Sequence, residues 1–395
     1  MTISALGIGM ESSPPEEKSN SLHWRSSSNL PYTGIDILLG NKEKIKELKG
    51  KRVALLTNQS ALTQNFKSSA YALHSLLDSS LAFLFAAEHG WSAFCAAGRD
   101  IENAQEPHTK LPIYSLFGSL FEKNLSLLEE VDALIIDVQD VGVRCYTYAA
   151  TCAKILEHIS SKGYALEVIL CDRPNPLGQR ENGPLLESAY RSLVSYIDVP
   201  FQHGKTLGEL LKHHNFSLAS PVNLSVLSTS SCIHPLQHLW IPPSPGLPDW
   251  EAVFLYPGLV LLEGINVSEG RGTSLPFKCI AAPHLDYIGI VTLINSIPDS
   301  GIRARPFSFI PQSGKFSGQA CQGAQIHILD YQKVDGLLIG VYLLHALSEN
   351  YPLFEWISSN RGDYWIDRLT GSPRLREALN QRETPQNIIA SWKAQ

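Results

Sequence analysis

Six carboxylate side chains stand out in this sequence because each follows an apolar run or lies in a glycine-rich loop. Hydrolysis of a glycosidic bond generally needs one acid that protonates the leaving oxygen and a second group that acts as base, nucleophile or charge stabiliser. Sequence gives no distance between carboxylates, so their roles and the choice between retention and inversion stay open. The six are Glu88, Asp137, Asp140, Asp172, Glu263 and Glu269.

The densest polar group follows the apolar run at residues 133–136, in the stretch DALIIDVQDVGVRCYTY. A continuous apolar run favours a strand buried on both faces, as in a parallel sheet. In open α/β sheets, ligands bind just outside the carboxyl ends of the strands. The stretch is therefore either an active-site wall or a turn in which Asp137 and Asp140 accept hydrogen bonds from backbone amides. Its other polar residues are Gln139, Arg144, Tyr146 and Tyr148.

Three further apolar runs also end in polar residues. Helix-like segments separate the runs, and this alternation indicates βαβ units and a parallel sheet. Four polar ends at one edge of a sheet would form a shared crevice, which favours a functional site over ordinary turn chemistry. No GxGxxG or GxxxxGKS/T motif follows any run, so no nucleotide cofactor is expected. The three ends are TNQS with Asn58, EHG with Glu88 and His89, and DRPNP with Asp172, Arg173 and Asn175.

A second polar concentration is the glycine-rich loop EGINVSEGRGT at residues 263–273. Its glycines allow the backbone to approach a ligand closely. On its own, the loop is better explained as solvated, with an ordinary Glu–Arg pair that contributes little. Beside a second crevice-forming region, it could close over the edge of the sheet. Its polar residues are Glu263, Asn266, Glu269, Arg271 and Thr273.

Other side chains have the chemistry to bind a substrate. An arginine can hold a carboxylate through two parallel hydrogen bonds, and the candidates are Arg144, Arg173 and Arg271. His203, in the segment QHGKT, is as consistent with an ordinary loop as with a site. Aromatic rings can stack on sugar faces, although most aromatic residues are simply core. The aromatic candidates are Trp91, Tyr146 and Tyr148.

Competing chemistries have weaker support. Glu88 and His89, together with nearby aspartates, could bind a divalent metal, but no HExxH or similar spacing supports a metal site. A Ser-His-Asp triad lacks its GxSxG motif. Cys145 lies among strand-like residues, which favours a structural thiol over a nucleophile. Thr206 and Glu209 are better explained as a capping box at a helix start than as site residues.

Composition describes a globular chain without the features of nucleic-acid or membrane binding. Of 395 residues, 44% are hydrophobic, and the net charge is −6 with a pI of about 6.1, which argues against a basic surface for nucleic acid. Seven cysteines without CxxC spacing suit reduced thiols better than disulfides or zinc. No signal peptide or transmembrane span is recognisable, so the expected location is the cytoplasm. The oligomeric state stays open.

The length of the chain and a change in its pattern of apolar runs and loops predict two domains after a short N-terminal arm. Residues 1–30, rich in Ser, Pro and Glu, are expected to be a poorly ordered arm. Residues 31–220 contain the alternating runs and helices of the predicted α/β parallel-sheet domain. In residues 221–395, short apolar pieces alternate with Pro/Gly-rich loops, which indicates a second, smaller domain.

The motifs taken together, in order, resemble the NamZ-type family of exo-β-N-acetylmuramidases. The segments that carry the resemblance are GIDILL, LLTNQS, EHG, DVQDVGVRCYTY, DRPNPLG, GPLLE, HGKTLGEL, PPSPGLP, YPG, EGINVSEGRGTSLPF and AAP. Each motif is weak alone, but the ordered set is highly specific. The resemblance implies a Rossmann-like domain, a smaller α+β C-terminal domain and an active site in the cleft between them. It also implies release of terminal, non-reducing N-acetylmuramic acid from small peptidoglycan fragments, without a cofactor.

The resemblance and the residue types together suggest roles for individual side chains. The family's EHG glutamate corresponds to Glu88, the expected catalytic acid/base, with Asp140 or Asp137 as the supporting carboxylate. Arg271 or Arg144 would pair with the lactyl carboxylate of muramic acid. The expected substrate-binding residues are Asn58, His89, Gln139, Arg144, Tyr146, Tyr148, Asp172, Arg173, Asn175, His203, Glu263, Asn266, Glu269, Arg271 and Thr273.

The chain departs from the family pattern at four positions. Ala87 stands where proline is usual, Phe117 where tyrosine is usual, Cys145 where an aromatic residue is usual and Gly246 where asparagine is usual. Because the carboxylates and Arg271 are present, we expect the chemistry to survive. Two alternatives stay open: a muropeptide-binding protein that has lost catalysis, and a metal-dependent hydrolase.

Overall fold

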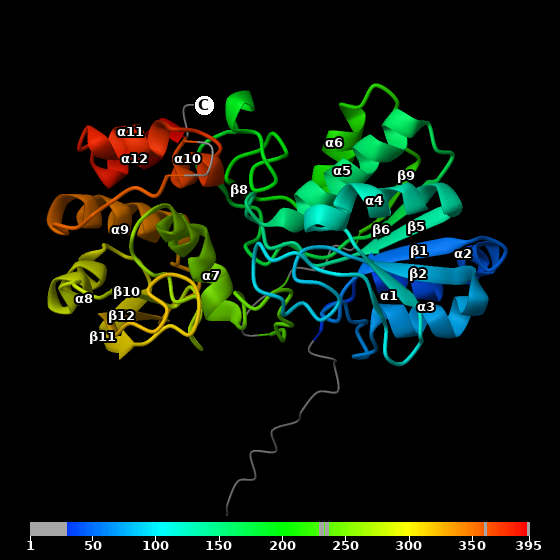
Figure 1. The fold of residues 1–395 in the computed structure, drawn as a ribbon, viewed down its shortest axis with the longest axis horizontal. Helices are drawn as coiled ribbons and strands as arrows, with labels where there is room; N and C mark the ends of the chain where they lie inside the picture. The colour runs from blue at the N-terminus through cyan, green and yellow to red at the C-terminus, as the bar shows by residue number, and fades with distance from the viewer. Residues whose placement is uncertain (1–29, 229–232, 234–236, 359–361, 393–395) are drawn as a thin grey trace, which may run out of the picture.

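The computed structural model describes residues 30–228, 233, 237–358 and 362–392. The arm predicted for residues 1–30 falls almost wholly outside these described residues, as does Cys232. The described part contains a mostly parallel central sheet and, further along the chain, a C-terminal region with its own sheet (Figure 1). The structure therefore confirms the α/β class and the parallel sheet.

The central sheet has seven strands in the order β3-β4-β2-β1-β5-β6-β9, and only β3 runs antiparallel to its neighbour. The apolar run at residues 133–136 lies in β5, whose five residues are all buried, as the pattern predicted. Since β9 belongs to this sheet, the sheet extends past residue 220. The strands are β1 (Val53–Thr57), β2 (Leu81–Ala86), β3 (Ala104–Gln105), β4 (Pro112–Ser115), β5 (Ala133–Asp137), β6 (Glu167–Cys171) and β9 (Leu224–Leu227).

Helices cover both faces of the central sheet. Figure 1 shows α1, α2 and α3 on one side and α4, α5 and α6 on the other. Two apolar clusters fill the two interfaces, one around Leu55 and Leu73 and the other around Ile136 and Leu156. The helices are α1 (Gly34–Gly40), α2 (Lys42–Leu48), α3 (Ser69–Leu77), α4 (Phe121–Leu125), α5 (Thr147–Lys162) and α6 (Leu207–Phe216). Helix α5 begins at Thr147, directly after the polar end of the β5 stretch.

The C-terminal region is built around a three-stranded antiparallel sheet in the order β10-β12-β11. Helix α8 packs against β11 and β12, and α7 packs against α9. The elements are α7 (Trp250–Leu259), β10 (Cys279–Ala282), α8 (Tyr287–Ser296), β11 (Ile302–Phe309), β12 (Cys321–Ile328), α9 (Gly336–Asn350), α10 (Trp365–Thr370), α11 (Arg374–Asn380) and α12 (Pro385–Trp392).

Glycines allow α7 and α9 to touch backbone to backbone. A Cβ at Gly258 would lie 1.9 Å from the Gly336 carbonyl oxygen, and a Cβ at Gly340 would lie 2.4 Å from the Gly258 Cα. No larger residue fits without moving a helix. This contact matters to the site because α7 and the 3₁₀ turn after it, Val260–Gly264, carry Tyr256 and Glu263.

Within the described residues, no helix is long and apolar enough to cross a membrane. The six described cysteines are all free thiols; Cys95 is half-buried and the other five are buried.

Candidate active site

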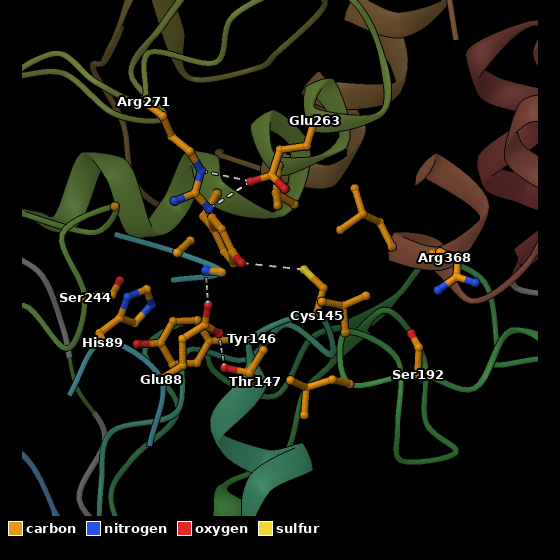
Figure 2. A pocket seen from close by; sticks show the side chains of 18 of the residues that line it. Glu88, His89, Cys145, Tyr146, Thr147, Ser192, Ser244, Glu263, Arg271 and Arg368 are labelled. Atoms are coloured by element: carbon orange, nitrogen blue, oxygen red, sulfur yellow. Dashed lines mark hydrogen bonds and ion pairs between the residues drawn. The ribbon is translucent and has the colours of Figure 1, made fainter. Parts of the chain in front are cut away.

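A cavity of about 540 Å³ lies where the central sheet region and the C-terminal region meet (Figure 2). The end of β2 contributes Glu88 and His89, and the segment leading into α5 contributes Cys145, Tyr146 and Thr147. The C-terminal region contributes Tyr256, Glu263, Arg271, Phe277, Trp365 and Arg368. Because β2 and β5 are parallel strands of one sheet, the segments after them open at the same edge.

Glu88 lies on the cavity wall with only 7% of its surface exposed. Its Oε1 accepts a hydrogen bond from the Gly98 amide at 2.8 Å, and its Oε2 accepts one from the Thr147 hydroxyl at 2.6 Å. A hydroxyl can also accept, so the Thr147 contact can hold the side chain in either protonation state. Of the three aspartates and glutamates named as catalytic from sequence, Glu88 alone lines this cavity.

His89 lies beside Glu88 in the left-handed backbone region, with φ of 71°. Its Nδ1 lies 2.7 Å from the Cys95 carbonyl oxygen, which only accepts, so Nδ1 carries the proton. Burial lowers the pKa of His89 and Arg271 lowers it further, while Glu88 and the bond to Cys95 oppose this shift. In the neutral ring, Nε2 is therefore the unprotonated nitrogen.

Glu263 and Arg271 form an ion pair across the cavity wall, as Figure 2 shows. Arg271 Nε and Nη2 lie 2.9 and 2.8 Å from Glu263 Oε1, and the guanidinium lies 4.8 Å from the centre of the Phe277 ring. Burial lowers the pKa of Arg271, but Glu263 and Glu269 outweigh this and raise it overall. A Cβ at Gly246 would lie 3.4 Å from Arg271 Nη1. The ordinary Glu–Arg pair expected in this loop exists, and it also forms part of the cavity.

A second cavity of about 570 Å³ adjoins the first and shares Glu263, Arg271, Trp365 and Arg368 with it. Glu269 lines this second cavity and is buried, with Lys315 Nζ 3.2 Å from its Oε2. Lys315 also donates to the carbonyl oxygens of Leu262 and Val267. These bonds fix the position of the loop that carries Arg271.

Tyr146 and Cys145 line the first cavity. The Tyr146 hydroxyl is buried, and burial raises its pKa. The Cys145 Sγ lies 3.6 Å from the Tyr256 hydroxyl, and burial raises the pKa of the thiol to about 12. Since the thiolate is the nucleophilic form, this environment suits the structural role expected for Cys145.

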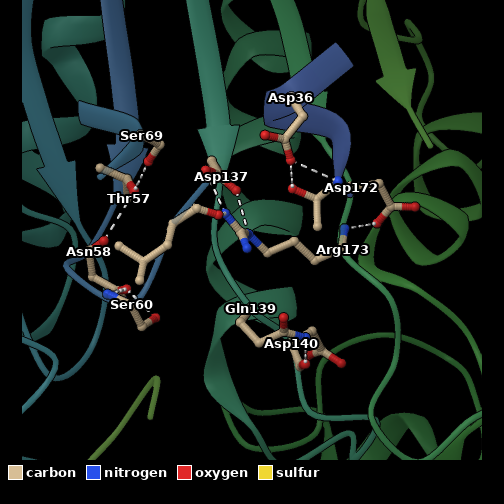
Figure 3. Close-up of polar contacts among 12 residues, drawn as sticks. Asp36, Thr57, Asn58, Ser60, Ser69, Asp137, Gln139, Asp140, Asp172 and Arg173 are labelled. Carbon is tan, nitrogen blue, oxygen red and sulfur yellow. Dashed lines mark hydrogen bonds and ion pairs between the residues drawn. The ribbon is translucent and has the colours of Figure 1, made fainter. Parts of the chain in front are cut away.

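Asp137 and Arg173 do not line either cavity. They form a buried pair in which Arg173 Nε and Nη2 lie 2.6 and 3.0 Å from the two carboxylate oxygens of Asp137 (Figure 3). Arg173 also donates to the Leu62 carbonyl oxygen at 3.0 Å. The pair links the ends of β5 and β6, so we no longer assign Asp137 to catalysis or Arg173 to substrate.

Asp140 and His203 form a second buried pair outside the cavities. Asp140 Oδ2 accepts a hydrogen bond from the Gly142 amide at 2.8 Å and lies 3.2 Å from His203 Nε2. His203 Nδ1 accepts from the Lys205 amide at 3.2 Å, which leaves the proton on Nε2, toward Asp140. The pair shapes the turn after β5, so neither residue is placed to meet a ligand in the cavity.

Arg144 is buried, and its guanidinium donates hydrogen bonds to neutral protein groups. It donates to the Ser195 hydroxyl at 3.0 Å, to the carbonyl oxygens of Pro184 (3.1 Å) and Val199, and to that of Thr370 at the end of α10. Burial lowers its pKa to about 10. Arg144 therefore ties the segment before α5 to the C-terminal region, and it is not available for the lactyl carboxylate.

The other residues predicted to bind substrate lie outside both cavities, and their side chains form hydrogen bonds with other groups of the protein. Asn58 donates to the Tyr148 hydroxyl, which donates to the Pro243 carbonyl oxygen; Gln139 donates to the carbonyl oxygens of Asp140 and Pro174. Asn175 donates to the Lys205 carbonyl oxygen, and Asp172 accepts from Thr206 and Gly208 at the start of α6. Asn266 bonds Leu353 and Glu355, and Thr273 donates to the Gly270 carbonyl oxygen. The Thr206–Glu209 capping box is confirmed.

Sequence reasoning missed several residues of the first cavity: Thr147, Ser192, Tyr256, Trp365 and Arg368. Thr147 lies between two tyrosines that were named, and a hydroxyl residue at a helix start next to a strand end was a usable signal. Trp365 and Arg368 lie in α10, outside every motif named from the sequence. Within the described residues, no group of three or more His, Cys, Asp or Glu side chains is placed to hold a metal ion.

Comparisons with known proteins identify the family of this chain. Residues 53–251 match the family model for the N-terminal part of the exo-β-N-acetylmuramidase NamZ, and residues 254–395 match the model for its C-terminal part. The chain is 34% identical over 368 residues to the peptidoglycan β-N-acetylmuramidase NamZ of Bacillus subtilis, covering 91% of this chain and 87% of that protein.

Two solved structures of DUF1343 family proteins from Bacteroides fragilis are also similar. One has a TM-score of 0.76 at 30% identity and covers 91% of this chain and 94% of its own. The other has a TM-score of 0.67 at 26% identity, covering 92% and 94%. With both family models matched in order along almost the whole described chain, this protein belongs to the NamZ family of exo-β-N-acetylmuramidases.

Proposed function

We propose that this protein is a glycoside hydrolase that releases terminal, non-reducing N-acetylmuramic acid from small peptidoglycan fragments. The observation that carries the proposal is Glu88, a buried carboxylate on the wall of a cavity whose volume is in the range of small-molecule sites. Family membership and the activity named for the Bacillus relative support the substrate class. The proposed active site is this cavity, in the cleft between the two regions.

In the proposed reaction, Glu88 is the general acid. Its proton passes to the glycosidic oxygen as the bond from that oxygen to the anomeric carbon breaks, and the leaving group departs as an alcohol. Thr147 and the Gly98 amide hold the two oxygens of Glu88 before and after this transfer. Water then supplies the hydroxyl group of the released sugar, and its second proton goes to a carboxylate.

Glu263 is the second carboxylate of the proposal, in place of Asp140 and Asp137. It lines the same cavity as Glu88, and Arg271 fixes its orientation through Nε and Nη2. A carboxylate at this position stabilises the positive charge that develops on the sugar ring in the transition state. The rings of Tyr146, Tyr256 and Trp365 supply apolar surface for the sugar.

Purified protein assayed on a chromogenic N-acetylmuramide and on the matching N-acetylglucosaminide tests the proposal. We expect release from the muramide with clear preference over the glucosaminide. Binding of muropeptides without turnover would select the alternative of a binding protein. Turnover that is abolished by chelators and restored by a divalent metal would select the alternative of a metal-dependent hydrolase.

We further propose that the protein is located in the cytoplasm. The free thiols of the six described cysteines support a reducing compartment.

We also propose that the chain divides into two domains after β9, the last strand of the central sheet. Between β9 and α7, no helix or strand is present among the described residues, and the two family models meet near residue 252. A boundary in this interval replaces the one expected near residue 220.

A further inference from the structure

Muramic acid differs from glucosamine by a lactyl ether on O3, which carries a carboxylate, so a muramidase needs a cation that can reach this group. Arg144 and Arg173 lie outside the cavity and are bonded to protein groups. Arg271 gives Nε and Nη2 to Glu263. None of the three arginines expected from sequence therefore has two guanidinium nitrogens available to bind both oxygens of a ligand carboxylate.

Two further arginines line the cavity, and they differ in how they are held. Arg191 lies at the rim, with its side chain 47% exposed, paired with Glu157 and stacked on the Tyr196 ring at 4.4 Å. Arg368, on α10, has a side chain only 15% exposed. Arg368 Nε lies 2.8 and 2.9 Å from the two carboxylate oxygens of Asp363.

The outer nitrogens of Arg368 are free to bind. Neither Nη1 nor Nη2 makes a hydrogen bond to another described residue, while Nε holds the side chain in place through Asp363. Arg368 is one of the residues that line both cavities. The planar guanidinium of arginine matches the two oxygens of a carboxylate.

Ser192 provides an independent observation at the same wall. Its hydroxyl oxygen is buried and has no hydrogen-bond partner among the described residues, and Ser192 is one of the residues that line the first cavity. In the view of Figure 2, Ser192 and Arg368 are both drawn on the side of the cavity away from Glu88. A buried hydroxyl that makes no hydrogen bond destabilises the protein unless a ligand supplies the missing partner.

We propose that Arg368 and Ser192 form a carboxylate-binding site that takes the lactyl carboxylate of the terminal sugar. This inference rests on the proposed function and adds the element that selects the substrate. Arg368 donates from Nη1 and Nη2, and Ser192 donates from its hydroxyl. Glu88 acts at C1 from one side of the cavity, while this site holds the substituent of C3 from the other.

The site also predicts which fragments are preferred. When a stem peptide is attached, the lactyl carboxylate becomes an amide and loses its charge. Hydrogen bonds from arginine to an ionised acceptor are stronger than those to a neutral one. The site therefore favours fragments whose terminal muramic acid carries no peptide over those that carry one.

Kinetics on the muramide and the glucosaminide test the site. In Arg368→Gln we expect KM for the muramide to rise about 10- to 100-fold, the range for lost hydrogen bonds to a charged group, so that the preference over the glucosaminide collapses. Ser192→Ala should raise the same KM by a smaller factor. Arg374→Gln is the matched control, since Arg374 pairs with the exposed Glu187 and lines neither cavity. An unchanged preference in Arg368→Gln would overturn the site.

Calorimetric binding of free N-acetylmuramic acid and of its neutral methyl ester separates this inference from the proposed function. The wild-type protein should prefer the acid, and Arg368→Gln should not. Acid preference that depends on Arg368 without any turnover would reject the function and keep the site. Turnover with equal binding of acid and ester would reject the site alone. If Arg368→Gln does not fold, Arg368→Lys and Ser192→Ala carry the same comparison.

Discussion

The segments after β2 and β5 look alike in sequence, because each carries a carboxylate after a buried apolar run. The two carboxylates differ in their hydrogen-bond partners and in whether they line a cavity. At the end of β2, Glu88 lines a cavity. Its carboxylate accepts hydrogen bonds from the Gly98 amide and from the Thr147 hydroxyl, and a hydroxyl can either donate or accept. At the end of β5, both oxygens of Asp137 are taken by the guanidinium of Arg173. Glu88 therefore keeps a face that a ligand in the cavity can contact, whereas Asp137 does not.

The sharpest test of this contrast is Glu88→Gln. The amide keeps the shape of the side chain but cannot supply a proton, so kcat should fall about 10²- to 10⁴-fold, the usual share of general acid–base catalysis. The free energy of unfolding should change little. Initial rates on the muramide, with circular dichroism as the control for folding, measure both effects. A kcat near that of wild type would remove Glu88 from its role.

At the other strand end, Asp137→Asn should show the opposite behaviour. The substitution leaves the buried Arg173 cation without its anion, and breaking one side of a buried pair costs about 3–5 kcal/mol of unfolding free energy. Urea unfolding measures this loss. The double variant Asp137→Asn/Arg173→Gln should recover part of it. A stable single variant with greatly reduced kcat would instead return Asp137 to the catalytic machinery.

A smaller effect is expected from removing the hydroxyl that holds Glu88. Thr147→Val should lower kcat/KM about 10-fold or more, because a hydrogen bond to a charged group is worth about 1.5–3 kcal/mol. Thr151→Val, one turn further along α5, is the matched control, since the buried Thr151 hydroxyl has no hydrogen-bond partner among the described residues. Equal kcat/KM values for the two variants would show that Thr147 does not position Glu88.

The smallest effect concerns His89 and the dependence of stability on pH. Burial lowers the pKa of His89 in the folded protein, so the unfolded chain binds a proton first as the pH falls. Stability is then fully present above the unfolded pKa of about 6.5 and declines below it. His89→Asn, which tolerates the positive φ, should flatten this decline. Melting temperatures from pH 5 to 8 measure it, and identical slopes would contradict the assignment.

The sequence predicted the parts of the fold that depend on local patterns. Buried apolar runs predicted β1, β2, β5 and β6, and their order with intervening helices predicted the parallel sheet. The ordered motifs predicted the family. Glu88, His89, Tyr146, Glu263 and Arg271 were named from sequence and line one cavity.

The remaining site residues could not be read from local patterns, because their partners are distant in sequence. Arg144 has the same motif context as Tyr146, yet its donors meet carbonyl oxygens of residues 184, 199 and 370. Nothing near Arg368 marks it as a ligand-binding residue. Its exposure to the cavity depends on how α10 packs beside the turn that carries Glu263.

Periodicity and motif order are enough to predict the class of fold, the family and the edge of the sheet at which polar groups gather. Which of these polar groups can contact a ligand depends on the folded structure. Asp137 and Arg144 are bonded to neighbouring protein groups and Asp140 lies outside both cavities, whereas Glu88 lines a cavity to which Arg368 also contributes. The physical reason is that the availability of a side chain depends on its hydrogen-bond partners, and here those partners come from distant parts of the chain.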